Sequence, residues 1–287
     1  MSTVGKLQRI YRLDVFTPEG LQITIRPPFS IEFSITRNTL ASANKASITL
    51  YNLGPSTRSR IFKDRFSITE YYRVELFAGY GNRLHRVFTG NILEAYSYRR
   101  QTEWITEIDA YDGLDAIQNG FTSQTVEANT PRGDVLRRIV DDMPNIVAGI
   151  FGTPAQGTSP RGQAFIGQST EIIDEITGSN YFIDQEELNV LAEDEALPGI
   201  VSQLDPSLLL ETPRRRDAYL DVVTLFEPTI QVGQIYAIES LEPIYNGQYI
   251  VIGFAHNVVI SNAESGQART NLQLYFGADG IREAQPV

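Results

Sequence analysis

Two histidines, His85 and His256, are the only imidazole groups in the chain, which has no cysteine. His256 shares one face of a predicted strand with Ile252, Phe254 and Val258, which is typical of a structural histidine. His85 stands among arginines and is expected at a solvated strand edge. The sequence also lacks a glycine-rich phosphate loop and a GxSxG motif. These absences indicate a protein without catalysis, metal or cofactor.

The acidic residues are the next candidates for chemistry, because they are unevenly distributed. The net charge is −11, yet residues 162–213 contain eleven acidic residues and no basic one, so the remaining acids and bases balance. A glycosidase pair would need a cleft lined by aromatic residues, and this segment offers only Tyr181 and Phe182. An EF-hand would need a different order of ligands from the one after Asp184. Neither hydrolysis nor calcium binding is supported.

Three interpretations of the acidic segment remain. It forms a solvated face, it pairs with arginines across an interface, or it lines a channel and repels polyanions. A pI near 4.8 argues against specific nucleic-acid binding, because phosphates are neutralised by basic surfaces. Under the third interpretation, seven carboxylates are expected to line the channel: Glu171, Glu175, Glu186, Glu187, Glu193, Asp194 and Glu195.

Arg214, Arg215 and Arg216 form the densest basic run. Side chains alternate along a strand, so the three cannot all point to one face. Pairing within or between subunits is favoured over contact with DNA, with the acids between residues 171 and 211 as the candidate partners. These arginines are the candidate interface residues.

The elements that would position these groups are mainly strands. Residues 29–36 alternate apolar and polar side chains, which predicts a strand with one buried face. Similar patterns occupy most of residues 1–120, with a short helix starting at Pro55. Residues 201–287 again predict strands, and a short helix is expected there as in the first region. The sequence therefore predicts two β regions.

Residues 121–200 differ from both β regions. Thr130 and Pro131 begin a predicted helix that Pro144 ends, and a second helix runs from Ser169 to a stop at Gly178. A small hairpin around residues 184–187 follows. The predicted division is therefore 1–120, an α+β insert at 121–200, and 201–287. A faint repeat of pattern, with Gly90 matching Gly247, suggests that the two β regions are related antiparallel barrels.

Several segments together resemble a known family. Residues 45–54 (KASITLYNLG), 74–80 (VELFAGY) and 87–92 (VFTGNI) are similar to the first tube-like domain of Mu-like baseplate hub proteins of contractile-tailed bacteriophages. Residues 222–228 (VVTLFEP) and 246–249 (NGQY) resemble the second tube-like domain of that family. Their order and spacing match the family as well. The resemblance covers roughly residues 10–118 and 200–277 and carries over no catalytic residue.

The resemblance implies a structural function. Hub proteins of this kind are homotrimers, in which two tube-like domains per subunit join a six-fold tail tube to a three-fold spike around the DNA channel. It implies contacts with the central spike protein, the tail tube or tube-initiator protein, baseplate wedge proteins and a tape-measure protein. It implies assembly in the host cytoplasm and a place in the tail baseplate of the virion. No membrane insertion is expected, because no apolar run reaches membrane-spanning length.

Other functions remain open on the sequence. A carbohydrate-binding or receptor-binding β module would also explain the strands and the 14 tyrosines. A virion-associated hydrolase is the enzymatic alternative. Tailocins and type VI-like injection machines use similar hubs and are not separated from a phage by these residues.

Overall fold

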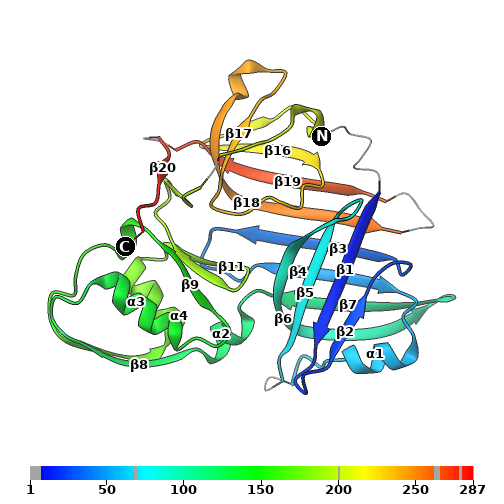
Figure 1. Cartoon of the computed structure of the whole chain (residues 1–287), viewed down its shortest axis with the longest axis horizontal. Helices are drawn as coiled ribbons and strands as arrows, with labels where there is room; N and C mark the ends of the chain where they lie inside the picture. The colour runs from blue at the N-terminus through cyan, green and yellow to red at the C-terminus, as the bar shows by residue number, and fades with distance from the viewer. Residues whose placement is uncertain (1–7, 68–69, 200, 262–265, 278–279, 287) are drawn as a thin grey trace.

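The computed structural model describes residues 8–67, 70–199, 201–261, 266–277 and 280–286. Antiparallel strands are the predominant secondary structure, as predicted, and Figure 1 shows two β regions with a smaller α+β region beside them. One hydrogen-bonded sheet of 13 strands runs through both β regions. The mainly β fold class with an α+β insert is confirmed.

The first β region surrounds its own apolar core. Its strands follow the order β3-β4-β7-β6-β5-β1-β2. The sheet doubles back, so that apolar residues of β1 and β5 pack against those of β3 and β4 in one cluster. The elements are β1 (Arg9–Phe16), β2 (Gln22–Ile25), β3 (Ile31–Asn38), β4 (Lys45–Tyr51), α1 (Pro55–Ile61), β5 (Tyr72–Tyr80), β6 (Arg83–Arg100), β7 (Glu103–Tyr111) and α2 (Leu114–Asn119).

The α+β insert has a separate core. Helices α3 and α4 contribute Leu136, Ile139 and Ile173, which pack with Leu188 and Val190 of a small sheet. Gly178, with φ of 63°, ends α4 in the left-handed conformation that glycine favours. The elements are β8 (Phe121–Val126), α3 (Arg132–Asp141), β9 (Val147–Phe151), β10 (Gln163–Gln168), α4 (Ser169–Thr177), β11 (Tyr181–Asp184) and β12 (Glu187–Val190).

The second β region continues the large sheet. Its core includes Val222, Val251 and Leu274 together with Phe182 and Leu191 of the insert. The elements are β13 (Glu195–Ala196), β14 (Ser202–Gln203), β15 (Arg214–Arg216), β16 (Tyr219–Leu225), β17 (Ile235–Ile238), β18 (Gly247–Ile260), β19 (Ala268–Tyr275) and β20 (Arg282–Glu283). The short β14 pairs with β17, and β13 pairs with β20.

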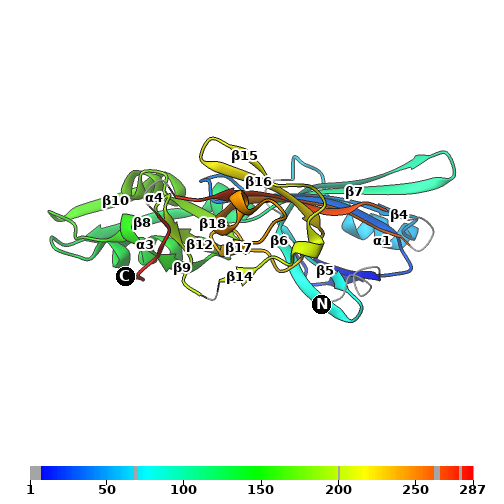
Figure 2. The ribbon, with the colours of Figure 1, turned by 90° about the horizontal axis from the view of Figure 1, so that it is seen from above.

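The two β regions are joined along one seam, which refines the picture of two barrels. Strand β3 pairs antiparallel with β18, from Ile31 opposite Ile260 to Asn38 opposite Gly253. The backbone groups at the edge of each unit are therefore satisfied by the other unit. Figure 2 shows the molecule edge-on, with the β15–β16 hairpin rising above its middle and the β6–β7 hairpin extending at its right end.

Two finer expectations need correction. The second β region was expected to contain a short helix, but its described residues form only the 3₁₀ turns Pro206–Leu208 and Pro243–Tyr245. The connection from β16 to β17 spans only residues 226–234, against 52–71 for the connection that holds α1, and it contains Pro228 and Gly233. The proposed match of Gly90 with Gly247 is also shifted, because β6 and β18 carry equivalent bulges at Leu93 and Ile252.

Candidate functional site: acidic segment, arginine edge and buried junction

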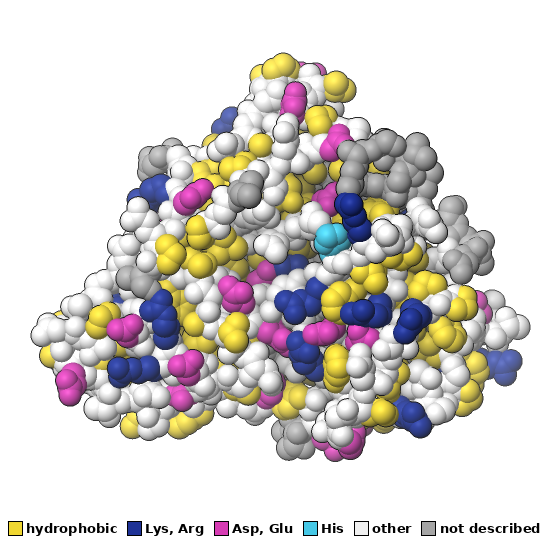
Figure 3. All heavy atoms as spheres, viewed as in Figure 1, with side chains coloured by type: hydrophobic (Ala, Val, Ile, Leu, Met, Phe, Trp, Pro, Cys, Tyr) yellow, Lys and Arg dark blue, Asp and Glu magenta, His cyan; other side chains and the backbone are white. Residues whose placement is uncertain are grey.

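The seven candidate carboxylates do not form one cluster of free charges. Glu171 and Glu175 on α4 are exposed, as is Glu193 in the loop between β12 and β13. Glu187 begins β12 and is half-buried. Figure 3 shows acidic and basic side chains intermixed across the middle of one face. Whether the exposed carboxylates face a channel therefore stays a prediction.

Three of the seven carboxylates, those of Glu186, Asp194 and Glu195, accept hydrogen bonds from other groups of the same chain. Glu186 accepts two hydrogen bonds from the guanidinium of Arg73, at 2.8 and 2.6 Å. Asp194 forms an ion pair with Arg282, whose Nε lies 2.9 Å from Oδ2. Both acids remain on the surface, but a nearby arginine offsets their charge.

Glu195 does not fit the channel-lining prediction. Its side chain is 6% exposed. Its carboxylate accepts hydrogen bonds from the backbone N–H of Thr153 at 3.0 Å and of Ala192 at 2.8 Å, and from the Thr153 hydroxyl. A buried carboxylate is stable only when it is bound in this way. Glu195 holds two loops of the insert together and presents no charge to a channel.

The three arginines form β15, an outer edge of the large sheet, and all three are exposed. Arg214 reaches Glu211 at 3.3 Å, and Arg216 reaches Asp221 at 2.9 Å. Arg215 lies over the ring of Phe276, 4.5 Å from its centroid. Pairing within the chain, which the sequence suggested, is thus present for two of them.

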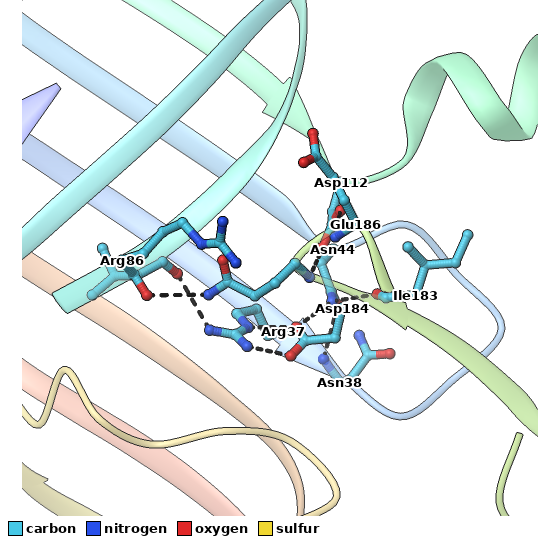
Figure 4. Close-up of polar contacts among 10 residues, drawn as sticks. Arg37, Asn38, Asn44, Arg86, Asp112, Ile183, Asp184 and Glu186 are labelled. Carbon is cyan, nitrogen blue, oxygen red and sulfur yellow. Dashed lines mark hydrogen bonds and ion pairs between the residues drawn. The ribbon is translucent and has the colours of Figure 1, made fainter. Parts of the chain in front are cut away.

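A buried ionic junction that the sequence did not reveal ties the insert to the first β region. Arg37, at the end of β3, is 3% exposed. Its Nε donates to Asp184 at 2.6 Å, and a second bond joins Nη2 to the other oxygen of the same carboxylate (Figure 4). Asn44 adds bonds to the backbone oxygen of Ile183 at 2.9 Å and to Asp184 at 3.1 Å. Bidentate geometry of this kind is strong and directional.

Asp112 supports the same junction from the end of β7. Its carboxylate accepts the backbone N–H groups of Gln185 at 2.5 Å and Glu186 at 3.0 Å. These two residues form the β11–β12 turn and have φ of 59° and 65°, which side chains other than glycine and asparagine rarely adopt. Burial raises the pKa of Asp112 to about 7, and the charge of Asp184 adds to the shift.

A polar cleft of about 450 Å³ opens beside the junction, between the β11–β12 hairpin and the loop before β17. Charged side chains of both signs, including Arg86 and Glu187, line it together with His85. No group of three or more potential metal ligands occurs among the described residues. The cleft has no cluster that points to a metal or a catalytic triad.

The histidines lie where the sequence predicted them. His85 is exposed, and His256 is fully buried on β18. Nδ1 of His256 lies 2.8 Å from the Thr270 hydroxyl, while Nε2 is buried without a partner. Burial lowers the pKa of His256 to about 3, so its ring is neutral near pH 7. A neutral ring in the core is structural, although only one of its nitrogens is satisfied.

A signal for the junction was present in the sequence. The inward positions of β3 are Ile31, Phe33 and Ile35, and the next inward position is Arg37. An arginine at an inward position requires a buried anion. The pattern identifies the need for a partner, but Asp184 is 147 residues away and no local feature points to it.

Comparison with known proteins agrees with this architecture. Residues 13–264 match the model of the family described as baseplate hub gp41. No curated protein matches the chain. Among the described residues, no helix has the length and hydropathy needed to cross a bilayer.

Several solved structures share the fold at low identity. The 43 kDa tail protein of prophage MuSo2 from Shewanella oneidensis has a TM-score of 0.59 and 7% identity, over 92% of this chain and 96% of that one. A tail protein from Neisseria meningitidis has a TM-score of 0.58 and 10% identity, over 94% and 97%.

A third structure comes from a secretion machine. The E. coli c3393 protein, a type VI secretion component described as structurally similar to the T4 tail proteins gp27 and gp5, has a TM-score of 0.57 and 7% identity, over 95% and 79%. These likenesses show the fold, and the family match covers most of the sequence. The chain therefore belongs to the baseplate hub gp41 family and is a structural component of a bacteriophage tail baseplate.

Proposed function

We propose that three copies of this chain close into a ring that joins the hexameric tail tube to the trimeric central spike and surrounds the DNA channel. The observation that carries the proposal is the internal duplication of the sheet. Strands β5-β6-β7 and β17-β18-β19 form two antiparallel meanders, each with a bulge in its middle strand. Three copies would present six such units, so one ring matches a six-fold partner on one side and a three-fold partner on the other.

The open edges of the large sheet support ring formation. The path of hydrogen-bonded strands ends at β15 on one side and at β2 on the other. Unpaired strand edges invite further pairing, and proteins cover them or use them for assembly. A head-to-tail contact between copies produces a closed ring when the rotation between them closes. The three regions predicted at 1–120, 121–200 and 201–287 then act as first β unit, insert and second β unit.

The proposed partners follow from this position. The two ring faces contact the tail tube or tube-initiator protein and the central spike, the rim contacts baseplate wedge proteins, and the tape-measure protein enters the channel. Exposed acids of residues 162–213 repel DNA from the channel wall, with Glu171, Glu175 and Glu193 as the exposed candidates. The ring carries no catalytic activity of its own in this proposal.

Electron cryomicroscopy of assembled tails tests this function. The expected image has three copies of the chain around the axis, with the two β units alternating in six positions next to the tube. Six copies in one ring, or a position on the outside of the baseplate away from the channel, would overturn the proposal. The second result would favour the receptor-binding alternative.

A further inference from the structure

The two β units correspond strand for strand. The first has the order β3-β4-β7-β6-β5 and the second has β15-β16-β19-β18-β17, with the same chain order and antiparallel pairing throughout. Strands β4 and β16 each have seven residues. Their registers also agree, because Lys45 pairs with Tyr111 as Tyr219 pairs with Tyr275. When the bulge residues Leu93 of β6 and Ile252 of β18 are aligned, Tyr111 again corresponds to Tyr275.

Among the described residues, the seam between the units therefore has a counterpart that no strand of the same chain occupies. Strand β17 covers β18 only from residue 247 to 250, and β3 covers it from 253 to 260. In the first unit, β5 covers β6 from residue 83 to 92. Beyond that point the same side of β6 is contacted by Lys63, which exchanges two backbone hydrogen bonds with Ala95, at 2.9 and 3.0 Å. The strand equivalent to β3 is β15, whose strand neighbour is β16.

We propose that β15 of one copy adds to the free edge of β6 in a neighbouring copy, as β3 adds to β18 within the chain. We name Arg214–Arg216 the arginine edge and residues 96–100 of β6, beyond the contact of Ala95 with Lys63, the tyrosine edge. The inference rests on the proposed ring and identifies the contact that closes it. The seam sets the register, because Thr36 faces Ala255, Ile35 faces His256 and Ser34 faces Asn257. The equivalent pairs between copies are Arg216 with Tyr96, Arg215 with Ser97, and Arg214 with Tyr98.

The backbone directions fit this register. The N–H and C=O of Ala95 point out of the sheet edge toward Lys63, so those of Ser97 point the same way, two residues on. On the other edge, the N–H of Leu210 donates to the C=O of Val223, so alternate residues of β16 face β15. Arg214 and Arg216 therefore face β16, and the backbone of Arg215 points outward. Arg215 and Ser97 are the residues that would exchange hydrogen bonds.

The side chains on one face are complementary. Tyr96 and Tyr98 are 42% and 37% exposed and stack with ring centroids 6.1 Å apart. The hydroxyl of Tyr98 donates to Glu107 at 2.8 Å, and Tyr96 donates to the same carboxylate. The guanidinium groups of Arg214 and Arg216 would lie over these rings and beside this carboxylate, which is the environment arginine prefers at interfaces.

The arginines are available for this contact. The side chains of Arg214 and Arg216 are 72% and 75% exposed, and their present ion pairs are surface pairs. Such pairs contribute little free energy, so a second acidic partner costs little to engage. Arg215 points to the opposite face of the sheet, where Arg99 of the neighbouring copy would lie, and gains no acidic partner there. The contact therefore depends on Arg214 and Arg216 and not on the charge of Arg215.

Cysteine cross-linking tests the register directly, because the chain has no cysteine of its own. In the R215C/S97C variant the two Cα atoms would lie within the range of 4.4 to 6.8 Å that a disulfide allows, as expected for paired strands. Mild oxidation of the full chain with its spike protein is expected to give covalent dimers and trimers. R215C and S97C alone provide the background. An assembled ring without covalent trimers would overturn the register.

Charge reversal tests the energetic part. R214E/R216E is expected to weaken association of the copies at least tenfold. The control R215E, whose reversed charge would face Arg99 of the neighbouring copy, should not weaken association, as measured by analytical ultracentrifugation. Equal effects of the two variants, or no effect of either, would overturn the proposed contact without refuting the proposed ring. A wild-type chain that stays monomeric with the spike protein would instead refute the proposed function, and the inference with it.

Discussion

Arg37 of β3 binds both carboxylate oxygens of Asp184 at the end of β11, and this pair joins the insert to the seam between the β units. Both residues are buried, so neither charge retains much contact with water. Removing one partner would leave the other charge uncompensated in a site of low dielectric constant. The orientation of the insert relative to the sheet therefore depends on this pair.

Replacing one member of the buried pair should destabilise the protein strongly. We expect R37M to lower the free energy of unfolding by about 3 to 5 kcal/mol, because the Asp184 carboxylate would remain buried without its cation. Urea unfolding followed by tyrosine and tryptophan fluorescence measures the change.

The exposed pair between Arg137 and Asp134, at 3.5 Å, supplies the control. R137M should cost less than about 1 kcal/mol, since surface ion pairs contribute little. The double variant R37M/D184L should recover part of the loss of R37M. Equal costs for R37M and R137M would contradict the role given to the junction.

Asp112 gives a prediction about pH. Its pKa of about 7 in the folded state lies above the ordinary value of 3.8, so the folded protein holds a proton that the unfolded chain has released between these values. Stability from this group therefore falls as pH rises from about 4 to 7. D112N has no such titration. The stability of the wild type minus that of D112N should decrease over this range, and a difference independent of pH would contradict the assignment.

His256 should matter for stability and not for chemistry. Its pKa of about 3 lies below the ordinary 6.5, so between these values the unfolded chain binds a proton that the folded state excludes. Stability from this group is lost as pH falls below about 6.5. H256Q should lose less stability than the wild type between pH 6.5 and 4.

The same variant tests the absence of imidazole catalysis. H256Q and the exposed control H85Q should support tail assembly and infection to the extent that the hub remains folded. A variant that folds and assembles normally but fails to infect would show that one of these rings has a chemical role.

The channel-lining hypothesis concerns the carboxylates that the structure leaves on the surface. Replacing four of them by lysine should leave the ring assembled but make it retain DNA at low salt, with retention falling steeply as salt increases. The four are the exposed Glu171, Glu175 and Glu193 and the half-buried Glu187. A filter-binding assay over a salt series measures retention.

Four exposed acids outside residues 162–213 provide a control with the same change in net charge: Glu70, Glu127, Asp141 and Glu242. This control ring should retain little DNA. If both rings bind DNA equally, net charge and not position explains the effect. If the first variant assembles and still ignores DNA, the lining hypothesis is wrong.

Local patterns in the sequence predicted much of the fold. The alternation in β3, the two helices of the insert and the hairpin at residues 184–187 all follow from short-range spacing. The seam does not, because it joins β3 to a strand more than 200 residues later and depends on backbone groups alone. The turn at Gln185 and Glu186 also escapes prediction, since neither residue type favours positive φ. Asp112, 73 residues before Gln185, holds that turn.

The candidate site was less accessible from the sequence than the fold. Counting charges identified residues 162–213, but it could not distinguish the buried Glu195 from the exposed Glu193, two residues away. That distinction depends on Thr153, whose backbone N–H and hydroxyl bind the Glu195 carboxylate. The arginine run was recognised as an interface candidate, whereas its proposed counterpart on β6 emerges only from the correspondence of the two units.

The mass of the assembled ring tests the central claim most directly. Native mass spectrometry of the chain mixed with its spike protein should detect a complex containing three hub copies, each of 32.1 kDa. Dissociation of that complex in the gas phase should release hub chains one at a time, up to three per complex. A complex with one, two or six hub copies would contradict the account, because only three copies give six equivalent β units around a three-fold spike.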